Sequence, residues 1–275
     1  LTPFGLLGSD KFKKELFINI IFTVLIFLAS YYLYFLTGDF LQWTAFGIGV
    51  YVICNWIHGL KNRDPVAFLL IFKSKALLLG LLSFPFITFV TYALGAFGPS
   101  FYIRNFSMTA TEVGIIYGLI TVFGSMIGVI CGGILGDKLR ETYVNGKLYL
   151  IMASAVLTGV TAIGFIHSEN LVASFTWKFV YHIASTAWLG CAASTVTELV
   201  LPRLRAVASA FFILMLSMIG LALGPYLTGM VSDIYINSGL LPGPALKNAM
   251  TLTLVVLVLP FGLLAIACKL SLIHI

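Results

Sequence analysis

Charge is scarce in this sequence: only 9% of its 275 residues are Asp, Glu, Lys or Arg, against about 25% in a soluble globular domain. Hydrophobic residues make up 60% of the chain, and the mean hydropathy is +1.05. A water-soluble fold of this length needs more polar surface than 16 basic and 10 acidic residues supply. This composition excludes a soluble enzyme, a disordered tail and a nucleic-acid-binding module, so we expect no nucleic-acid partner.

Clustered metal ligands and the common catalytic signatures are missing as well. The motifs H-E-x-x-H, G-x-S-x-G and Walker A do not occur. The four cysteines lie far apart inside apolar runs, which fits neither a metal-ligand spacing nor a disulfide framework; they are Cys54, Cys131, Cys191 and Cys268. We therefore expect no catalytic residues, no metal, no cofactor and no ATP hydrolysis by the chain itself.

Long apolar runs are what the sequence does contain. A helix needs about 20 consecutive apolar residues to cross the bilayer core, and lipid cannot pair a free backbone group. Eight segments reach that length, so we predict an all-α integral membrane protein with eight transmembrane helices. The segments are residues 16–36, 41–60, 76–97, 112–135, 148–167, 171–200, 206–232 and 249–268.

The basic residues mark one side of these predicted segments. Of the 16 Lys and Arg residues, all but three fall on one side of the membrane in this arrangement. The exceptions are Arg104 and Lys247 on the opposite side and Lys178 within a segment. Because basic loops remain in the cytoplasm, both ends of the chain are predicted to be cytoplasmic. We expect a bacterial inner (plasma) membrane location, surrounded by membrane lipids.

We expect the chain to divide into five parts. Residues 1–15 form a cytoplasmic lead, 16–60 a transmembrane hairpin, 61–75 a cytoplasmic linker and 76–268 a six-helix unit. Residues 269–275 are interpreted as non-native read-through, because their last six residues resemble one reading frame of a sequencing adaptor. The first residue is not Met, and we interpret the chain as a piece of a longer protein.

A pattern of three glycines and one aspartate occurs twice in the six-helix unit. The two helices that carry it lie three segments apart and cross the membrane in opposite directions, as an inverted-topology repeat requires. We therefore predict two inverted three-helix repeats; the alternative is chance matching among 26 glycines. The copies are Gly124, Gly128, Gly133 and Asp137, then, 96 residues later, Gly220, Gly224, Gly229 and Asp233. We assign the glycines other than Gly133, together with Pro225, to helix packing.

These motifs resemble signatures of the major facilitator superfamily of transporters. The stretch Gly133 to Arg140, interpreted as a loop, is similar to the family's cytoplasmic G-x-L-a-D-r-x-g-r signature, although Arg140 replaces the second glycine. The stretch Gly220 to Pro225 is similar to the family's G-x-x-x-G-P pattern. Residues 202–206, together with Gly224-Pro225 and Ser232-Asp233, are similar to the spinster-like branch.

The resemblance implies both a fold and a function. Residues 76–268 would form the carboxy-terminal half of a secondary active transporter that moves a small or amphipathic organic solute by alternating access, coupled to an ion or a proton. The missing amino-terminal half of the same chain would complete the cavity. The hairpin at 16–60 is either an inserted pair or the family's fifth and sixth helices. A membrane-embedded enzyme and a passive assembly subunit remain alternatives.

Polar residues deep in the predicted segments are the candidate site. Lys178 and His182 lie one helical turn apart, where an ionisable side chain is costly and usually faces a cavity. The alternative for Lys178 is to extend outward to the interface. In the resembled family the first helix of each repeat lines the central cavity. We therefore assign to the substrate or coupling site Lys178, Tyr181, His182, Ser185, Thr88 and Tyr92.

Charged residues near the ends of the segments have other predicted roles. Asp137 should approach the positive end of the helix that starts near residue 206. In the resembled family this contact latches one conformation; we call Gly133, Asp137, Arg203 and Arg205 the latch residues. Thr109 and Glu112 have the spacing of a capping box. Glu198 is expected to form an ion pair with Arg203 or Arg205.

Overall fold

The computed structural model describes residues 12–73, 75–198, 202 and 205–273, which are helical apart from short turns. No strand occurs among these described residues. Within the described ranges, seven helical stretches are long and apolar enough to cross a membrane. The chain divides into two compact units at residues 74 and 75.

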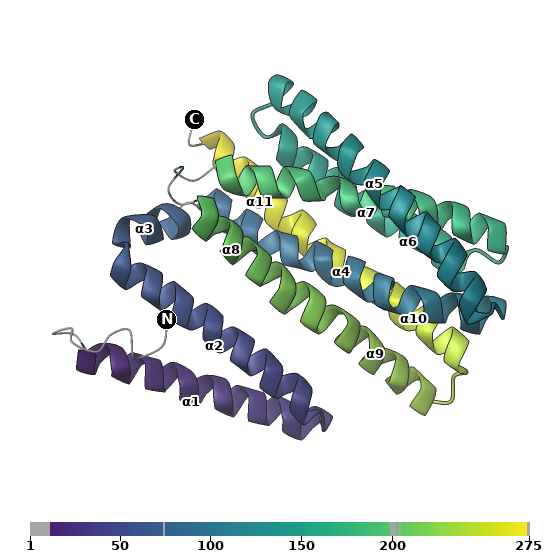
Figure 1. The fold of residues 1–275 in the computed structure, drawn as a ribbon, viewed down its shortest axis with the longest axis horizontal. Helices are drawn as coiled ribbons and strands as arrows, with labels where there is room; N and C mark the ends of the chain where they lie inside the picture. The colour runs from purple at the N-terminus through teal and green to yellow at the C-terminus, as the bar shows by residue number, and fades with distance from the viewer. Residues whose placement is uncertain (1–11, 74, 199–201, 203–204, 274–275) are drawn as a thin grey trace. The chain divides into compact units, whose positions relative to one another are not determined.

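The first unit is a helical hairpin followed by a short helix. Helices α1 (Phe12–Thr37) and α2 (Phe40–Arg63) pack against each other (Figure 1). The turn between them uses Gly38 at φ +81°, a left-handed conformation that glycine adopts without steric cost. Helix α3 (Pro65–Lys73) lies within the predicted linker and was not expected. Its first residue is proline, whose fixed φ suits the first helical position.

The second unit contains the remaining helices (Figure 1). Four long helices come first: α4 (Lys75–Phe106), α5 (Ala110–Thr142), α6 (Gly146–His167) and α7 (Leu171–Glu198). Two interrupted helices follow. One consists of α8 (Arg205–Met215), the π-helical segment η3 (Leu216–Leu221) and α9 (Ala222–Asn237). The other consists of α10 (Pro242–Thr253), the 3₁₀ segment η4 (Leu254–Leu257) and α11 (Val258–Ile273).

Several helices are longer than the apolar runs that predicted them; α10, for example, begins at Pro242, seven residues before the predicted start at residue 249. Helix α4 continues through Pro99 to Phe106, and α5 continues to Thr142. The signature from Gly133 to Arg140 is therefore helical and not the loop that we predicted. Hydropathy marks only the part of a helix that lies in lipid. Beyond that part, Lys138, Leu139 and Arg140 are good helix formers that continue α5.

Two prolines follow the irregular segments in the second unit. A proline inside a helix cannot donate to the carbonyl four residues earlier. Pro225 lies four residues after Leu221, the last residue of η3, and Pro260 lies three residues after Leu257, the last residue of η4. Irregular helix geometry therefore accompanies these two prolines, whereas the helix around Pro85 remains α-helical.

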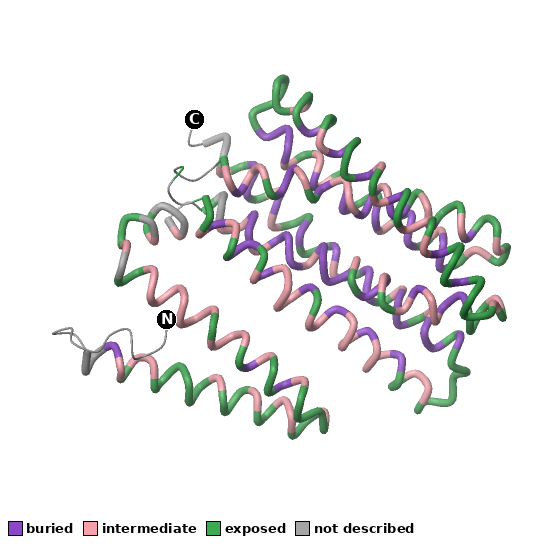
Figure 2. Tube along the Cα trace, viewed as in Figure 1, coloured by how far each residue is buried: buried purple, intermediate pink, exposed green. Residues whose placement is uncertain are grey.

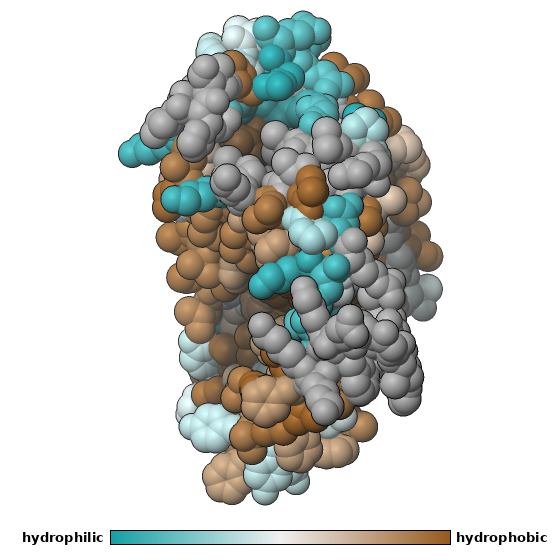
Figure 3. Space-filling view, turned by 90° about the vertical axis from the view of Figure 1, so that its left-hand side faces the viewer, coloured by the Kyte–Doolittle hydropathy of each residue, from teal (hydrophilic) through white to brown (hydrophobic). Residues whose placement is uncertain are grey.

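Helices α4 and α7 are enclosed by the other helices of the second unit. Helix α7 packs against α5 and α6, and α4 packs against η3, α9, α10 and α11. The buried residues lie mainly along these contacts (Figure 2). Large apolar side chains point outward elsewhere, for example Val122 at 62% exposure and Leu157 at 53%, and apolar surface covers much of the face seen in Figure 3. An apolar exterior of this extent is typical of helices that face lipid.

Candidate functional site

Lys178 lies in the interior of the second unit. Its side chain is 0% exposed, so it does not extend to the interface. The Nζ atom lies 4.2 Å from the ring centre of Phe165, 4.4 Å from that of Tyr181 and 4.9 Å from that of Tyr117. We call these three rings, from α6, α7 and α5, the aromatic cage. Within the described residues Nζ has no hydrogen-bond partner, so the π faces of the rings are what the structure provides to hold a cation there.

Hydrogen bonds between helices fix the position of the cage. The Tyr102 hydroxyl, on α4, lies 3.0 Å from Ser174 Oγ on α7, and Ser174 Oγ donates to the Phe165 carbonyl on α6 at 2.8 Å. The Tyr117 hydroxyl donates to the Gly95 carbonyl on α4 at 3.3 Å. Because each bond joins two helices, the rings around Lys178 are held by four helices at once.

His182 lies beside the cage, one turn further along α7. Its Nε2 atom lies 3.0 Å from Thr121 Oγ1 on α5, and its ring centre lies 5.3 Å from that of Tyr181. Ser185 continues the same buried face at 5% exposure and donates to the His182 carbonyl at 3.3 Å. The structure thus brings together the predicted residues Lys178, Tyr181, His182 and Ser185 on α7.

The two candidates on α4 lie elsewhere. Thr88 is 5% exposed, donates to the Pro85 carbonyl at 2.8 Å and packs against Gly220 of η3. Tyr92 is 44% exposed. Neither residue contributes a ring or a polar atom to the aromatic cage.

Sequence reasoning found Tyr181 but missed the other two rings of the cage and its supports. Phe165, Tyr117, Tyr102 and Thr121 are common residue types in apolar segments, and their contacts with α7 arise only from tertiary packing. One signal was available for Tyr117: it lies seven residues after the start of α5, as Lys178 lies seven residues after the start of α7.

Glycines let α5 and α7 approach closely. A Cβ atom at Gly128 would overlap the Thr186 side chain and the Ile183 backbone, and one at Gly132 would overlap the Ala187 backbone. Gly133 instead faces open space within the described part of the chain. The close contact therefore follows every fourth residue of α5: Gly124, Gly128, Gly132 and Gly136.

A second set of glycines makes the same kind of contact between η3–α9 and α4. A Cβ atom at Gly220 would overlap the Thr88 side chain, and one at Gly224 would overlap the Phe89 carbonyl. At Gly229 it would lie 3.1 Å from the Phe97 ring. Pro225 lies beside Gly224 in the first turn of α9.

One lysine connects α5, α6 and α7 at the ends of these helices that lie away from the aromatic cage. Lys147 is 7% exposed, and its Nζ lies 2.5 Å from Glu198 Oε1 and 3.6 Å from Asp137 Oδ1. Glu198 therefore pairs with a lysine of α6, whereas a pair with Arg203 or Arg205 stays a prediction, because Arg203 lies outside the described residues. Sequence reasoning counted Lys147 only as a charge in a loop.

The other latch residues are placed only in part. Arg205 Nε donates to the Thr197 carbonyl at 3.2 Å, whereas Arg203 lies outside the described residues. The contact of Asp137 with either arginine stays a prediction. The predicted capping box is confirmed: the Glu112 amide donates to Thr109 Oγ1 at 3.3 Å, and the Thr109 amide donates to Glu112 Oε2 at 2.9 Å.

Comparison with known proteins gives transporters as relatives. The chain is 32% identical over 149 residues to an MFS-type efflux pump of Mycolicibacterium smegmatis, a match that covers 54% of this chain and 34% of the pump. It is 26% identical over 173 residues to Protein spinster of Drosophila melanogaster, covering 58% and 28% of the two chains. The human Protein spinster homolog 1 is 24% identical over 177 residues, covering 58% and 33%. The chain thus spans about a third of the curated relatives that it matches. No protein-family model matches it.

Solved structures show the same fold. A bacterial homolog of the human lysosomal transporter Spinster, inward-facing and unoccupied, matches with a TM-score of 0.67 at 23% identity over 78% of this chain and 51% of that one. Its inward-facing, occupied form gives a TM-score of 0.65 over 84% and 57%. Together with the seven apolar helices, these relatives identify a multi-pass integral membrane protein that is similar to spinster-like transporters of the major facilitator superfamily.

Proposed function

We propose, from this homology to major facilitator and Spinster transporters, that the chain forms the carboxy-terminal part of a secondary active transporter. The transporter moves a small or amphipathic organic solute by alternating access, coupled to an ion or proton gradient, in a bacterial inner membrane. An amino-terminal half of the same chain completes the cavity. The observation that carries this proposal is the similarity of the chain to transporters in both sequence and fold.

Reciprocal packing supports the inverted repeats. If α4–α5–α6 is one repeat and α7–α8/α9–α10/α11 is the other, the second helix of each repeat packs by its glycines against the first helix of the other. The third helices follow the same rule, because α6 packs against α7 while α10 and α11 pack against α4. A pseudo-two-fold axis that relates the two repeats would produce this pattern, in which each repeat packs against the first helix of the other.

In this arrangement α7 is the eighth membrane-spanning helix. Its 28 residues extend about 42 Å at 1.5 Å per residue, enough to cross a bilayer. It is not among the seven stretches apolar enough to cross a membrane by composition, and several of its polar residues, including Lys178 and His182, are buried. A helix enclosed by protein can carry polar residues that a lipid-facing helix cannot.

We assign the substrate or coupling site to Lys178, Tyr181, His182 and Ser185, with Thr88 and Tyr92 on α4. An intramembrane lysine costs about 2.5 to 3.5 kcal/mol at a helix centre, and such residues mark substrate or ion pathways. In the present conformation the aromatic cage encloses the Lys178 ammonium. Separation of α5, α6 and α7 at this level would admit water or solute to it.

We assign the latch to Gly133, Asp137, Arg203 and Arg205 and extend it with Lys147 and Glu198. Lys147 joins the ends of α5, α6 and α7 through two carboxylates. Those ends have to separate or shift when the cavity opens on that side.

Flux through reconstituted vesicles tests the function. The complete reading frame that contains this chain would be incorporated into vesicles, and the uptake of a fluorescent single-chain amphiphile and of ethidium would be followed with and without a proton gradient. We expect protein-dependent, saturable uptake that responds to the gradient. Uptake no faster than in protein-free vesicles, for both probes and under both conditions, would contradict the proposal and favour an assembly subunit.

A further inference from the structure

The α1–α2 hairpin has a polar half and an apolar half. In the half that contains the start of α1 and the end of α2, polar side chains of the two helices form pairs. His58 Nε2 pairs with Glu15 Oε2, and Asn62 Nδ2 donates to the same oxygen at 2.9 Å. One turn further, Asn19 Nδ2 donates to Asn55 Oδ1 at 2.9 Å, and the Tyr51 hydroxyl donates to Asn19 Oδ1 at 3.1 Å. We call these six residues the polar ladder. Hydrogen bonds of this kind between helices help to hold them together in lipid.

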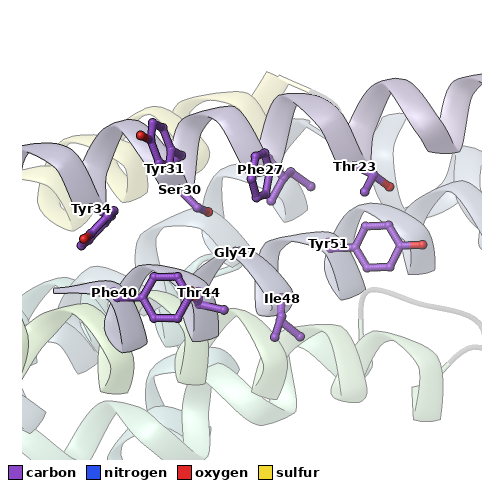
Figure 4. A pocket seen from close by; sticks show the side chains of 11 residues that line it. Thr23, Phe27, Ser30, Tyr31, Tyr34, Phe40, Thr44, Gly47, Ile48 and Tyr51 are labelled. Carbon is purple, nitrogen blue, oxygen red and sulfur yellow. The ribbon is translucent and has the colours of Figure 1, made fainter.

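A pocket begins where the polar ladder ends. It encloses about 340 Å³ between the two helices (Figure 4). Gly47 lets the two helices approach closely, because a Cβ atom there would overlap Ser30 Oγ. The surface of the pocket is almost entirely apolar, and five aromatic rings contribute to it. The lining residues are Thr23, Ile26, Phe27, Ser30, Tyr31, Tyr34, Phe40, Thr44, Gly47, Ile48 and Tyr51.

The chemistry of the lining excludes a charged ligand. No Asp, Glu, Lys or Arg lines the pocket. Two of its hydroxyls are bonded within the hairpin, because Thr23 Oγ1 donates to the Asn19 carbonyl at 2.9 Å and Tyr51 donates to the Asn19 side chain. An occupant must therefore be held by dispersion and shape.

The position of the pocket points to the bilayer. From Thr23 to Tyr34 the α1 wall extends about 16 Å, roughly half the thickness of a hydrocarbon core. Tyr34 and Phe40 flank the turn at Gly38, where aromatic side chains suit the level of the lipid headgroups. The surface around the pocket is also apolar: Phe27 is 66% exposed and Leu28 is 55% exposed.

We propose that this pocket binds one acyl chain of a phospholipid from the leaflet at the Gly38 turn, which is the outer leaflet by the charge rule. The glycerol region lies at the level of the Tyr31 and Tyr34 hydroxyls. The polar ladder holds the two walls at a fixed separation before lipid arrives, which reduces the entropic cost of binding. This lipid is a structural component and not the transported solute, so the inference does not depend on the proposed function.

Photolabelling tests the proposal. The full chain would be reconstituted in phosphatidylcholine vesicles that contain a trace of phosphatidylcholine with a diazirine in its acyl chain, and labelled peptides would be mapped by mass spectrometry. We expect Phe27, Thr44 and Ile48 to be labelled several-fold more than Leu28 and Phe35, which are also exposed on the hairpin but do not line the pocket. Thr44→Trp fills the pocket and should reduce the labelling of Phe27 to that of Leu28. Leu36→Trp, which lies outside the pocket, should leave the labelling of Phe27 unchanged.

The wild-type comparison alone can overturn the proposal, whether or not the variants fold. Equal labelling of Phe27, Ile48, Leu28 and Phe35 would mean that only non-specific surrounding lipid contacts the hairpin. Labelling of Phe27 and Ile48 below that of Leu28 and Phe35 would mean that protein, such as a second hairpin, occupies the pocket in place of lipid. Persistence of the excess label at Phe27 in a folded Thr44→Trp variant would also contradict it.

Discussion

Lys178 is surrounded by three aromatic rings and, in the described structure, has no carboxylate or hydrogen-bond partner. Removing an ammonium ion from water costs several kcal/mol even after relaxation, whereas cation–π contacts return about 2 kcal/mol or somewhat more when desolvated. This side chain therefore destabilises the fold. Natural proteins break a stability rule of this kind mainly at functional sites.

Replacement of Lys178 by Met should stabilise the protein. Methionine has a similar length, fills the cage and makes favourable sulfur–aromatic contacts. We expect Lys178→Met to raise the free energy of unfolding by about 1 to 4 kcal/mol, measured as a higher melting temperature in detergent. Lys138→Met, at an exposed position on α5, should leave it unchanged. A lower melting temperature for Lys178→Met would show that the lysine stabilises the fold.

Loss of Lys147 should loosen the ends of α5, α6 and α7. Lys147→Ala leaves Glu198 and Asp137 without their shared cation. We expect faster alkylation of Cys191, which is 2% exposed and packs on Gly132 and Gly136. The measurement uses a variant in which Cys191 is the only cysteine.

Lys138→Ala is the matched control, because it removes an exposed lysine and should keep the wild-type alkylation rate. An unchanged rate for Lys147→Ala would mean that its ion pairs do not hold these ends together.

Individual residues were predictable where the signal was local. The spacing of Thr109 and Glu112 is sufficient for the capping box, because both partners lie in one helical turn. The depth of Lys178 could also be read from its segment. The aromatic cage could not, because its rings come from three helices whose packing depends on the whole unit.

At the scale of helices, α5 shows that neighbouring glycines differ in role. Gly132 lies against the Ala187 backbone, whereas Gly133 points to open space in the described part of the chain. The repeated sequence pattern contains Gly133, so the pattern alone selected a glycine outside the contact. The four-residue spacing of the contact appears only when α7 is in place.

Alanine at these two positions should have opposite effects. Gly132→Ala forces α5 away from α7 and should destabilise the protein by about 1 to 3 kcal/mol. Gly133→Ala meets no atom and should stabilise the helix by about 0.5 to 1 kcal/mol through reduced backbone freedom in the unfolded state. Thermal unfolding of the two purified variants checks this sign difference. Equal effects would mean that α5 and α7 do not pack through this face.

Helix existence was more predictable than helix extent. Each of the eight apolar runs corresponds to a helical stretch, because a run long enough to cross lipid leaves the backbone no other structure. The ends were misplaced at α4, α5, α9 and α10, and α3 was missed, because helices outside lipid are determined by capping and packing rather than by hydropathy.

At the scale of the whole molecule, the chain resembles solved Spinster-type structures in fold over 78% to 84% of its length, and the glycine contacts of its second unit are reciprocal between the proposed repeats. Three observations support one account. The chain is similar to transporters in sequence and fold, it contains a buried lysine with no carboxylate partner in the described structure, and a charge cluster lies at the helix ends away from that lysine. The account is alternating access around a site on α7.

The uptake of a fluorescent single-chain amphiphile by vesicles that contain the complete reading frame tests this claim most directly, with wild type, Lys178→Met and Lys138→Met compared at equal protein. We predict that uptake by Lys178→Met is at least tenfold slower, which corresponds to a loss of about 1.4 kcal/mol of transition-state stabilisation. The variant should nevertheless be folded and more heat-stable than wild type. Uptake by Lys138→Met should match wild type. Wild-type uptake rates in both variants would contradict the claim that Lys178 forms the transport site.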